Sequence, residues 1–313
     1  MREVCERIID EISSVFVGRR EVIEKILACV ISNGHVLIED YPGLGKTLLA
    51  KLLSRLLDLK FTRIQFTPDL LPSDILGTKV WKQREGVFEL VKGPIFTNVL
   101  LADEINRTPP KTQAALLEAM EERQVTIEGE THLLPHPFFV IATQNPIEQE
   151  GTYPLPEAQM DRFLMRISLG YPESIEDEVR VLERRMGWRR DDPTRDVEPV
   201  ISREEFLRIQ EMCEGIYVGE RVLRYIGEVI RRTREDRRIE VGASPRGGIA
   251  LLKASRAVAL INGREFVIPD DVKFVAEDTL SHRIVLSIEE ALEGRRERGI
   301  IREIMEEVPV PKE

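Results

Sequence analysis

The sequence predicts an α/β protein with a five-stranded parallel sheet, followed by a small all-α domain. In the first half, short apolar runs rich in Val, Ile and Phe alternate with helix-like stretches, which is the pattern of a parallel sheet covered by helices. Beyond Pro172 no strand-like run returns. The expected strands are His35–Glu39, Phe61–Phe66, Val99–Asp103, Phe138–Thr143 and Phe163–Ser168.

Two weak points in this pattern indicate the domain boundaries. The alternation fades near Gly170–Pro172, and residues 191–199 are rich in Pro, Asp and Arg. We therefore expect an α/β core over residues 1–172, a linker over 173–200 and a helical domain over 201–313.

We expect four or five helices in residues 201–313, and several of their first residues can be identified from the sequence. Capping boxes and prolines at first helical positions mark the starts. They are Ser202 with Glu205, Ser287 with Glu290, Pro245 after Ser244, and Pro269.

Composition and charge disfavour several classes of protein. The three cysteines, Cys5, Cys29 and Cys213, are far apart in the sequence, which favours reduced core thiols in a cytoplasmic protein over a zinc or redox site. Acidic residues exceed basic ones, 55 against 45, so the chain as a whole repels the nucleic-acid backbone. No apolar run approaches the roughly 18 residues of a membrane span, and the N-terminus lacks the apolar segment of an export signal.

A glycine-rich loop follows the first expected strand and opens a leucine-rich helix, the order that a phosphate-binding loop requires. Its glycines let backbone N–H groups point inward, and the helix N-terminus adds positive potential. Lys46 is expected to reach the β- and γ-phosphates of ATP, and the Thr47 hydroxyl to bind Mg²⁺. Asp40 stands where the usual pattern has a glycine. The expected nucleotide contacts are Pro42, Gly43, Leu44, Gly45, Lys46, Thr47 and Leu48.

Two carboxylates end the third expected strand, Val99–Asp103. Asp103 is placed to hold hydrated Mg²⁺, and Glu104 to orient and deprotonate the attacking water. Two acids at a strand end can also be a helix cap. The phosphate-binding loop favours the catalytic interpretation.

With these pieces in place, the chain resembles the MoxR family of AAA+ ATPases from about Val17 to His282. The resemblance implies an AAA+ P-loop NTPase core with a helical lid, and Mg²⁺-dependent hydrolysis of ATP. The segments that carry it are Gly93–Asn98, Leu101–Arg107, Pro109–Gln113, Leu116–Met120, Ala142–Pro146 and Pro154–Phe163.

The resemblance also implies two further contacts with the nucleotide. Val17 and Gly18 match the segment that packs against adenine, although a plain turn before a helix is the alternative. Asn145 matches sensor 1, whose amide lies beside the γ-phosphate and the water. Gln144 or Thr143 take that role if the register is shifted.

Two arginines match groups that respond to the phosphates. Arg162 matches the arginine finger, which reaches into the neighbouring subunit's site and stabilises charge on the γ-oxygens. The alternative is a pair with Asp161 or Glu157 in its own chain. Arg246 matches sensor 2 in the first turn of a lid helix, from where it is expected to swing toward the phosphates and couple lid closure to nucleotide state.

Two segments resemble inserts of the branch that includes magnesium-chelatase ATPases. Residues 74–90 are expected to form a hairpin turning near Arg84–Gly86, and residues 123–134 a second hairpin. Each is interpreted either as a contact for a client protein or as edge decoration.

The resemblance implies a homo-oligomeric ring, by AAA+ analogy a hexamer, that remodels or activates a partner protein. Family members often work alongside proteins with von Willebrand factor A domains. A nucleic-acid motor is disfavoured by the acidic composition and by the lack of an appended DNA-binding module. The chain has no recognisable segment that is specific to metal-chelatase motor subunits. Intact Glu104, Asn145 and Arg162 argue against a nucleotide-controlled switch with little turnover.

Overall fold

A five-stranded parallel sheet forms the centre of the computed structural model, which describes residues 1–146, 151–188 and 191–311. The strand order is β2-β5-β8-β1-β9, and all neighbours pair in parallel. Each strand lies within two residues of its expected bounds, so the predicted sheet is confirmed. The strands are β1 (Val36–Glu39), β2 (Phe61–Gln65), β5 (Val99–Asp103), β8 (Phe139–Gln144) and β9 (Met165–Ile167).

Alternating side chains of the sheet pack into two separate hydrophobic cores, one on each face. In β5, Val99 and Leu101 face one cluster while Leu100 and Ala102 face the other, as the period of two in a strand requires. The second cluster packs against α5 (Pro110–Glu122). The first cluster packs against α1 (Arg2–Val15), α2 (Arg20–Ile31) and α3 (Lys46–Leu56).

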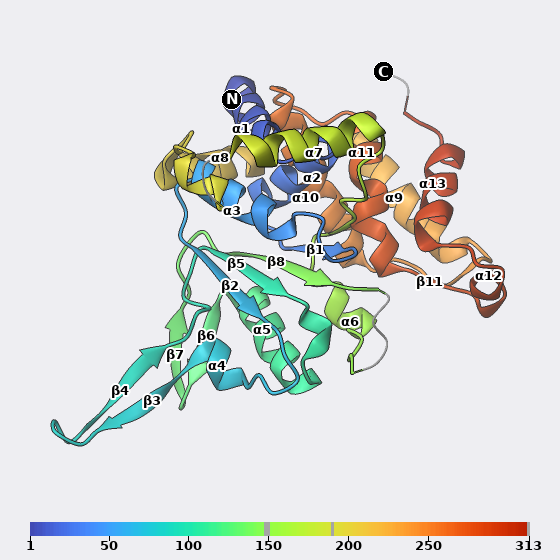
Figure 1. Ribbon diagram of the computed structural model, residues 1–313. Coiled ribbons are helices and arrows are strands. Elements are labelled where there is room, and N and C mark those ends of the chain that lie inside the picture. The colour runs from blue at the N-terminus through green and yellow to red at the C-terminus, as the bar shows by residue number, and fades with distance from the viewer. Residues whose placement is uncertain (147–150, 189–190, 312–313) are drawn as a thin grey trace.

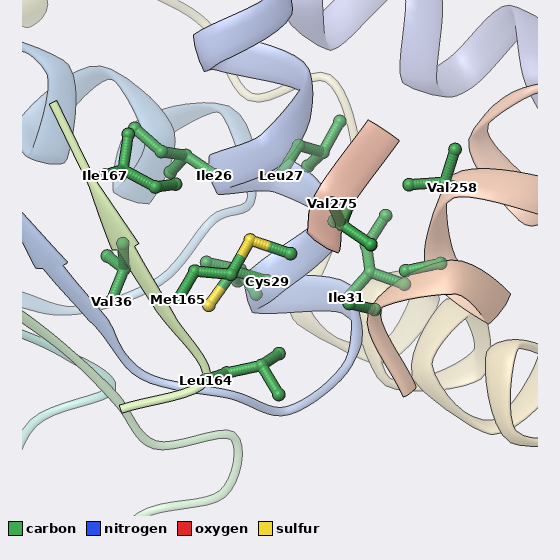
Figure 2. Close-up of a cluster of buried hydrophobic side chains, with 14 of the residues drawn as sticks. Ile26, Leu27, Cys29, Ile31, Val36, Leu164, Met165, Ile167, Val258 and Val275 are labelled. Atoms are coloured by element: carbon green, nitrogen blue, oxygen red, sulfur yellow. The ribbon is translucent and has the colours of Figure 1, made fainter. Parts of the chain in front are cut away.

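The first core continues into the C-terminal helices. Figure 2 shows α2 side chains between the strand residues Val36 and Met165 on one side and Val258 and Val275 of the C-terminal helices on the other. Cys29 lies in this core, and all three cysteines are buried and unpaired. The C-terminal helices are therefore packed onto the α/β core through α2.

The C-terminal part contains six α-helices among the described residues, one or two more than expected. They are α8 (Arg203–Glu214), α9 (Glu220–Glu235), α10 (Pro245–Ile261), α11 (Pro269–Leu280), α12 (Ile288–Leu292) and α13 (Glu297–Glu307). The capping box of Ser202 and Glu205 is complete. At Ser287 only the bond from the Glu290 backbone N–H is present.

The expectation that no strand follows Pro172 was wrong. Strand β10 (Ile239–Val241) pairs antiparallel with β11 (Val285–Leu286). These strands have three and two residues, too few to produce a recognisable alternation. The segment 173–200, expected as a linker, contains helix α7 (Ile175–Gly187) and a 3-10 turn at Pro193–Asp196.

Both expected hairpins are present. After α4 (Pro72–Leu76), strands β3 (Gly77–Lys82) and β4 (Val87–Lys92) form a ribbon that extends away from the rest of the molecule (Figure 1). Strands β6 (Gln124–Ile127) and β7 (Glu130–Leu133) form the second hairpin. Within the described ranges, no helix is long and apolar enough to cross a membrane.

Candidate active site

The sheet order brings three strand ends together. Strand β8 lies between β1 and β5, so the loop after β1, the acids at the end of β5 and Asn145 after β8 meet at one edge. A cavity of about 420 Å³ lies there. It is lined by residues 42–48, Arg63, Gln65, Asp103, Glu104 and Asn145.

The loop has the backbone geometry of a phosphate cradle. Gly43 and Gly45 have φ of +87° and +78°, a region that favours glycine. A Cβ on Gly45 would also lie 2.9 Å from the Phe16 ring. Gly45 precedes the first residue of α3, Lys46, so the helix N-terminus points its free N–H groups at the cavity.

Lys46 directly follows Gly45 in the sequence, and its side chain lines this cavity. Its Nζ donates a hydrogen bond to the carbonyl oxygen of Asp40 at 2.6 Å. Burial lowers the pKa of the Lys46 ammonium, and the negative charges of Asp40, Asp103 and Glu104 oppose that shift. A phosphate anion would supply the same kind of compensation, so this side chain suits an anionic ligand.

Both acids of the β5 end are held in place by neighbouring strands. The Asp103 carboxylate accepts a hydrogen bond from the Thr143 hydroxyl at 2.6 Å and from Arg63 Nη2 at 2.6 Å. The Glu104 backbone is left-handed, with φ 58° and ψ 50°, and such strained conformations cluster at functional sites. Its carboxylate accepts from Gln65 Nε2 at 2.5 Å and lies 3.2 Å from Arg107 Nε.

Of the three candidates for the sensor position, Asn145 lines the cavity. The Gln144 side chain donates instead to Glu39 at 2.7 Å. Thr143 bridges the two acids, because its hydroxyl also accepts from the Glu104 backbone N–H at 2.9 Å. Of the three, Asn145 is therefore the residue that lines the cavity, and Thr143 holds the Asp103 carboxylate and the Glu104 backbone.

A second cavity of about 530 Å³ adjoins the first. Val17 and Gly18 line it, as expected of a base pocket, together with residues 169–173 and part of α7. The two cavities share Pro42–Gly45 and Leu48. A nucleotide with its base in the larger cavity and its phosphates in the smaller one would therefore follow the loop.

The structure explains the departure at Asp40. This residue is buried, and its carboxylate accepts hydrogen bonds from the Ser168 hydroxyl at 2.8 Å and from the Leu169 backbone N–H. Its φ is not in the left-handed region, unlike Gly43 and Gly45. A side chain is accommodated here because β9 ends with donors that satisfy it.

The two expected phosphate-sensing arginines do not line either cavity of their own chain. Both bind one carboxylate, that of Glu121 at the end of α5: Arg162 lies 3.2 Å and Arg246 2.8 Å from it. Arg162 is thus ion-paired within its chain, but its partner is neither Asp161 nor Glu157. Arg246 does not reach the phosphate cavity in this arrangement.

The residues present fit Mg²⁺. The Thr47 hydroxyl and the Asp103 carboxylate line the same cavity, and Mg²⁺ is usually bound by one or two protein oxygens together with substrate phosphates and water. Across the described ranges no cluster of three or more His, Cys, Asp or Glu side chains forms a metal site. The ion would be held together with the nucleotide, and Arg63, which donates to the Asp103 carboxylate, would compete with it.

Arg63, Gln65 and the α7 wall of the second cavity were not among the site residues expected from the sequence. Arg63 and Gln65 are alternate residues of β2 beside the β5 end, with Gln65 opposite Asp103. Two polar side chains at positions i and i+2 of the neighbouring strand were the available signal. Helix α7 has no buried residue, so its pattern did not indicate a packed element.

Comparison with known proteins agrees with this geometry. The family model of the ATPase family associated with various cellular activities (AAA) matches residues 35–165, and the AAA lid domain model matches residues 231–304. The chain is 48% identical to Bacillus subtilis YeaC, over 97% of this chain and 93% of that protein. It is 41% identical to the chaperone MoxR1 of Mycobacterium tuberculosis, over 98% and 82%.

Two further matches extend over almost the whole chain. The protein MoxR of Methylorubrum extorquens is 30% identical over 99% of this chain and 96% of that protein. The crystal structure of a Cytophaga hutchinsonii protein assigned as an ATPase superimposes with a TM-score of 0.90 at 44% identity, covering 99% of this chain and 96% of that one.

Proposed function

The chain belongs to the MoxR family of AAA+ ATPases, and we propose that it is a magnesium-dependent, ring-forming ATPase that remodels or activates a partner protein. One observation carries the catalytic part: a single cavity holds Lys46, Thr47, Asp103, Glu104 and Asn145. These are the groups needed to bind a triphosphate with its metal and to direct water at the γ-phosphate.

Each group has a distinct role in this proposal. Lys46 exchanges the Asp40 carbonyl for the β- and γ-phosphates. Thr47 and Asp103 hold Mg²⁺, which neutralises the phosphate charge when bound. Glu104 accepts the proton of the attacking water, and the Asn145 amide positions that water beside the γ-phosphate.

Two variants separate binding from hydrolysis. We expect Lys46→Ala to lose nucleotide binding, since the phosphate charge loses its partner, while Glu104→Gln binds ATP but hydrolyses it very slowly. A fluorescent ATP analogue reports binding, and phosphate release reports turnover. Normal turnover by Glu104→Gln would exclude Glu104 as the base.

The placement of Arg162 supports the ring. It lines neither cavity of its own chain, and 28% of its side chain is exposed although it is paired with Glu121, so a neighbouring subunit can reach it. Head-to-tail contacts of this kind close into rings, and we propose a hexamer. Arg246 shares the Glu121 carboxylate with Arg162. We therefore also propose that Arg246 senses nucleotide from the surface that carries Arg162.

Mixed rings test the role of Arg162. Arg162→Ala should keep ATP affinity and lose on the order of 10³-fold in turnover. Adding Lys46→Ala subunits, which have an inactive cavity but an intact finger, should restore part of the activity. Failure to restore activity in mixed rings that are shown to form would count against action between subunits.

The β3–β4 hairpin is the proposed contact for the client protein. Proteins with von Willebrand factor A domains, which often accompany members of this family, are the proposed class of client. Trp81 and Phe88 pair across the strands with ring centroids 5.0 Å apart, yet they are 52% and 66% exposed. Exposed aromatic side chains of this kind are typical of binding surfaces.

Shortening the hairpin tests this contact. Replacing Arg84–Val87 with a Gly-Ser turn should leave basal hydrolysis and assembly unchanged, while abolishing binding to the partner or stimulation by it. The same change in the β6–β7 turn is the matched control. Normal partner response in the β3–β4 variant would move the client surface elsewhere, first to the helical C-terminal part.

A further inference from the structure

We propose that Arg283 is a positioning residue for Arg162, so that the helical C-terminal part controls the arginine finger offered to the neighbouring subunit. This inference rests on the proposed role of Arg162 between subunits. Arg283 lines neither cavity. Through its contacts, the helical C-terminal part would affect the active site of the neighbouring subunit.

Arg283 holds the backbone on both sides of the finger. It ends the 3-10 turn after α11, and only 3% of its side chain is exposed. Its guanidinium donates to the carbonyl oxygens of Asp161 at 3.0 Å, Phe163 at 2.7 Å and Leu164 at 3.1 Å. The segment that carries Arg162 is therefore fixed before and after it by one side chain from the C-terminal part.

Asp161 connects this clamp to the second arginine. One carboxylate oxygen accepts from Arg283 Nε at 2.7 Å, and the other lies 3.6 Å from Arg246 Nε. Arg246 in turn shares Glu121 with Arg162. The charges alternate in sign along this path, from Arg283 through Asp161, Arg246 and Glu121 to Arg162.

The path crosses between the two parts of the chain. Arg246 and Arg283 belong to the C-terminal helices, whereas Glu121, Asp161 and Arg162 belong to the α/β core. A shift of the C-terminal part must therefore move the 161–164 backbone or break these bonds. Planar arginine with several fixed donors suits such a clamp, and lysine cannot reproduce it.

The test uses two partner subunits that are each inactive alone. The acceptor is Arg162→Ala, which has an intact cavity and no finger. The donor is Lys46→Ala, which has an intact finger and no functional cavity. Arg283→Lys is then added either to the donor or to the acceptor, and turnover of the mixed rings is measured together with their assembly.

Arg283→Lys should matter only in the donor. In the donor it should reduce the restored kcat by at least about tenfold, because the finger is worth far more than that, with KM for ATP unchanged. In the acceptor it should change the restored activity by less than about twofold, because that chain has no finger to position. The acceptor arm also reports whether the variant folds and assembles.

A second variant covers the case in which Arg283→Lys does not fold. Asp161→Asn keeps the shape of the side chain and removes the charge shared by Arg283 and Arg246, and it should give the same loss in the donor only.

Equal activity with modified and unmodified donors overturns the inference alone. Equal loss in both arms also overturns it, since the residue is then merely structural. No restoration with unmodified subunits overturns the proposed action of Arg162 between subunits, and the inference with it.

Discussion

The buried carboxylate of Asp40 accepts a hydrogen bond from the Ser168 hydroxyl at 2.8 Å. This bond joins the end of β1 to the end of β9, two neighbouring strands of the sheet. The same residue offers its carbonyl oxygen to Lys46. Asp40 therefore connects Lys46 with Leu169 in the wall of the second cavity.

We predict that Asp40→Gly, which creates the usual loop glycine, destabilises the protein. It removes two hydrogen bonds to a charged acceptor, and one such bond is worth about 1.5–3 kcal/mol, so a loss of at least about 2 kcal/mol is expected. Asp40→Asn keeps one acceptor oxygen and should fall between. Urea denaturation measures the effect, and a glycine variant as stable as the wild type would contradict this role.

The hydrogen bond from Gln65 to the Glu104 carboxylate predicts that Gln65 restrains the proposed catalytic base. A net hydrogen bond is worth about 1 kcal/mol, so Gln65→Leu should raise basal turnover by about fivefold by freeing the carboxylate, with ATP affinity unchanged. Phosphate release and nucleotide binding measure the two. In the Glu104→Gln background the same substitution should have no effect. A fall in turnover would show that Gln65 supports the base instead.

The bonds from Arg63 to Asp103, at 2.6 and 3.0 Å, predict competition with Mg²⁺. Arg63→Ala should lower the Mg²⁺ concentration for half-maximal turnover at saturating ATP, by about threefold or more, because it removes a cation from the ion's ligand. Arg55→Ala, on α3 but outside the phosphate cavity, is the control. An unchanged or higher Mg²⁺ requirement for the Arg63 variant would contradict this competition.

Local sequence patterns were sufficient for the sheet and for the phosphate cavity. The three inner strands β1, β5 and β8 are mostly apolar, because both faces of a parallel sheet are buried. The edge strands β2 and β9 include the polar residues Arg63, Gln65 and Arg166. The loop with Lys46 and the acids Asp103 and Glu104 lie directly after such runs. Their meeting at one edge then follows from the strand order.

Contacts between distant segments could not be predicted in this way. The pairing of Arg162 and Arg246 with Glu121 depends on how the C-terminal helices pack on the core. The bond from Thr143 to Asp103 depends on the placement of β8 beside β5. Short β10 and β11 pair across more than 40 residues of sequence, and neither has a pattern of its own.

Turnover per subunit, measured against protein concentration, tests the central claim most directly. Sedimentation is measured at the same concentrations. If Arg162 completes the neighbour's site, wild-type turnover per subunit rises as rings form and then reaches a plateau, while Arg162→Ala stays low even when assembled. Wild-type turnover per subunit that is constant from the monomer to the assembled ring would contradict the account.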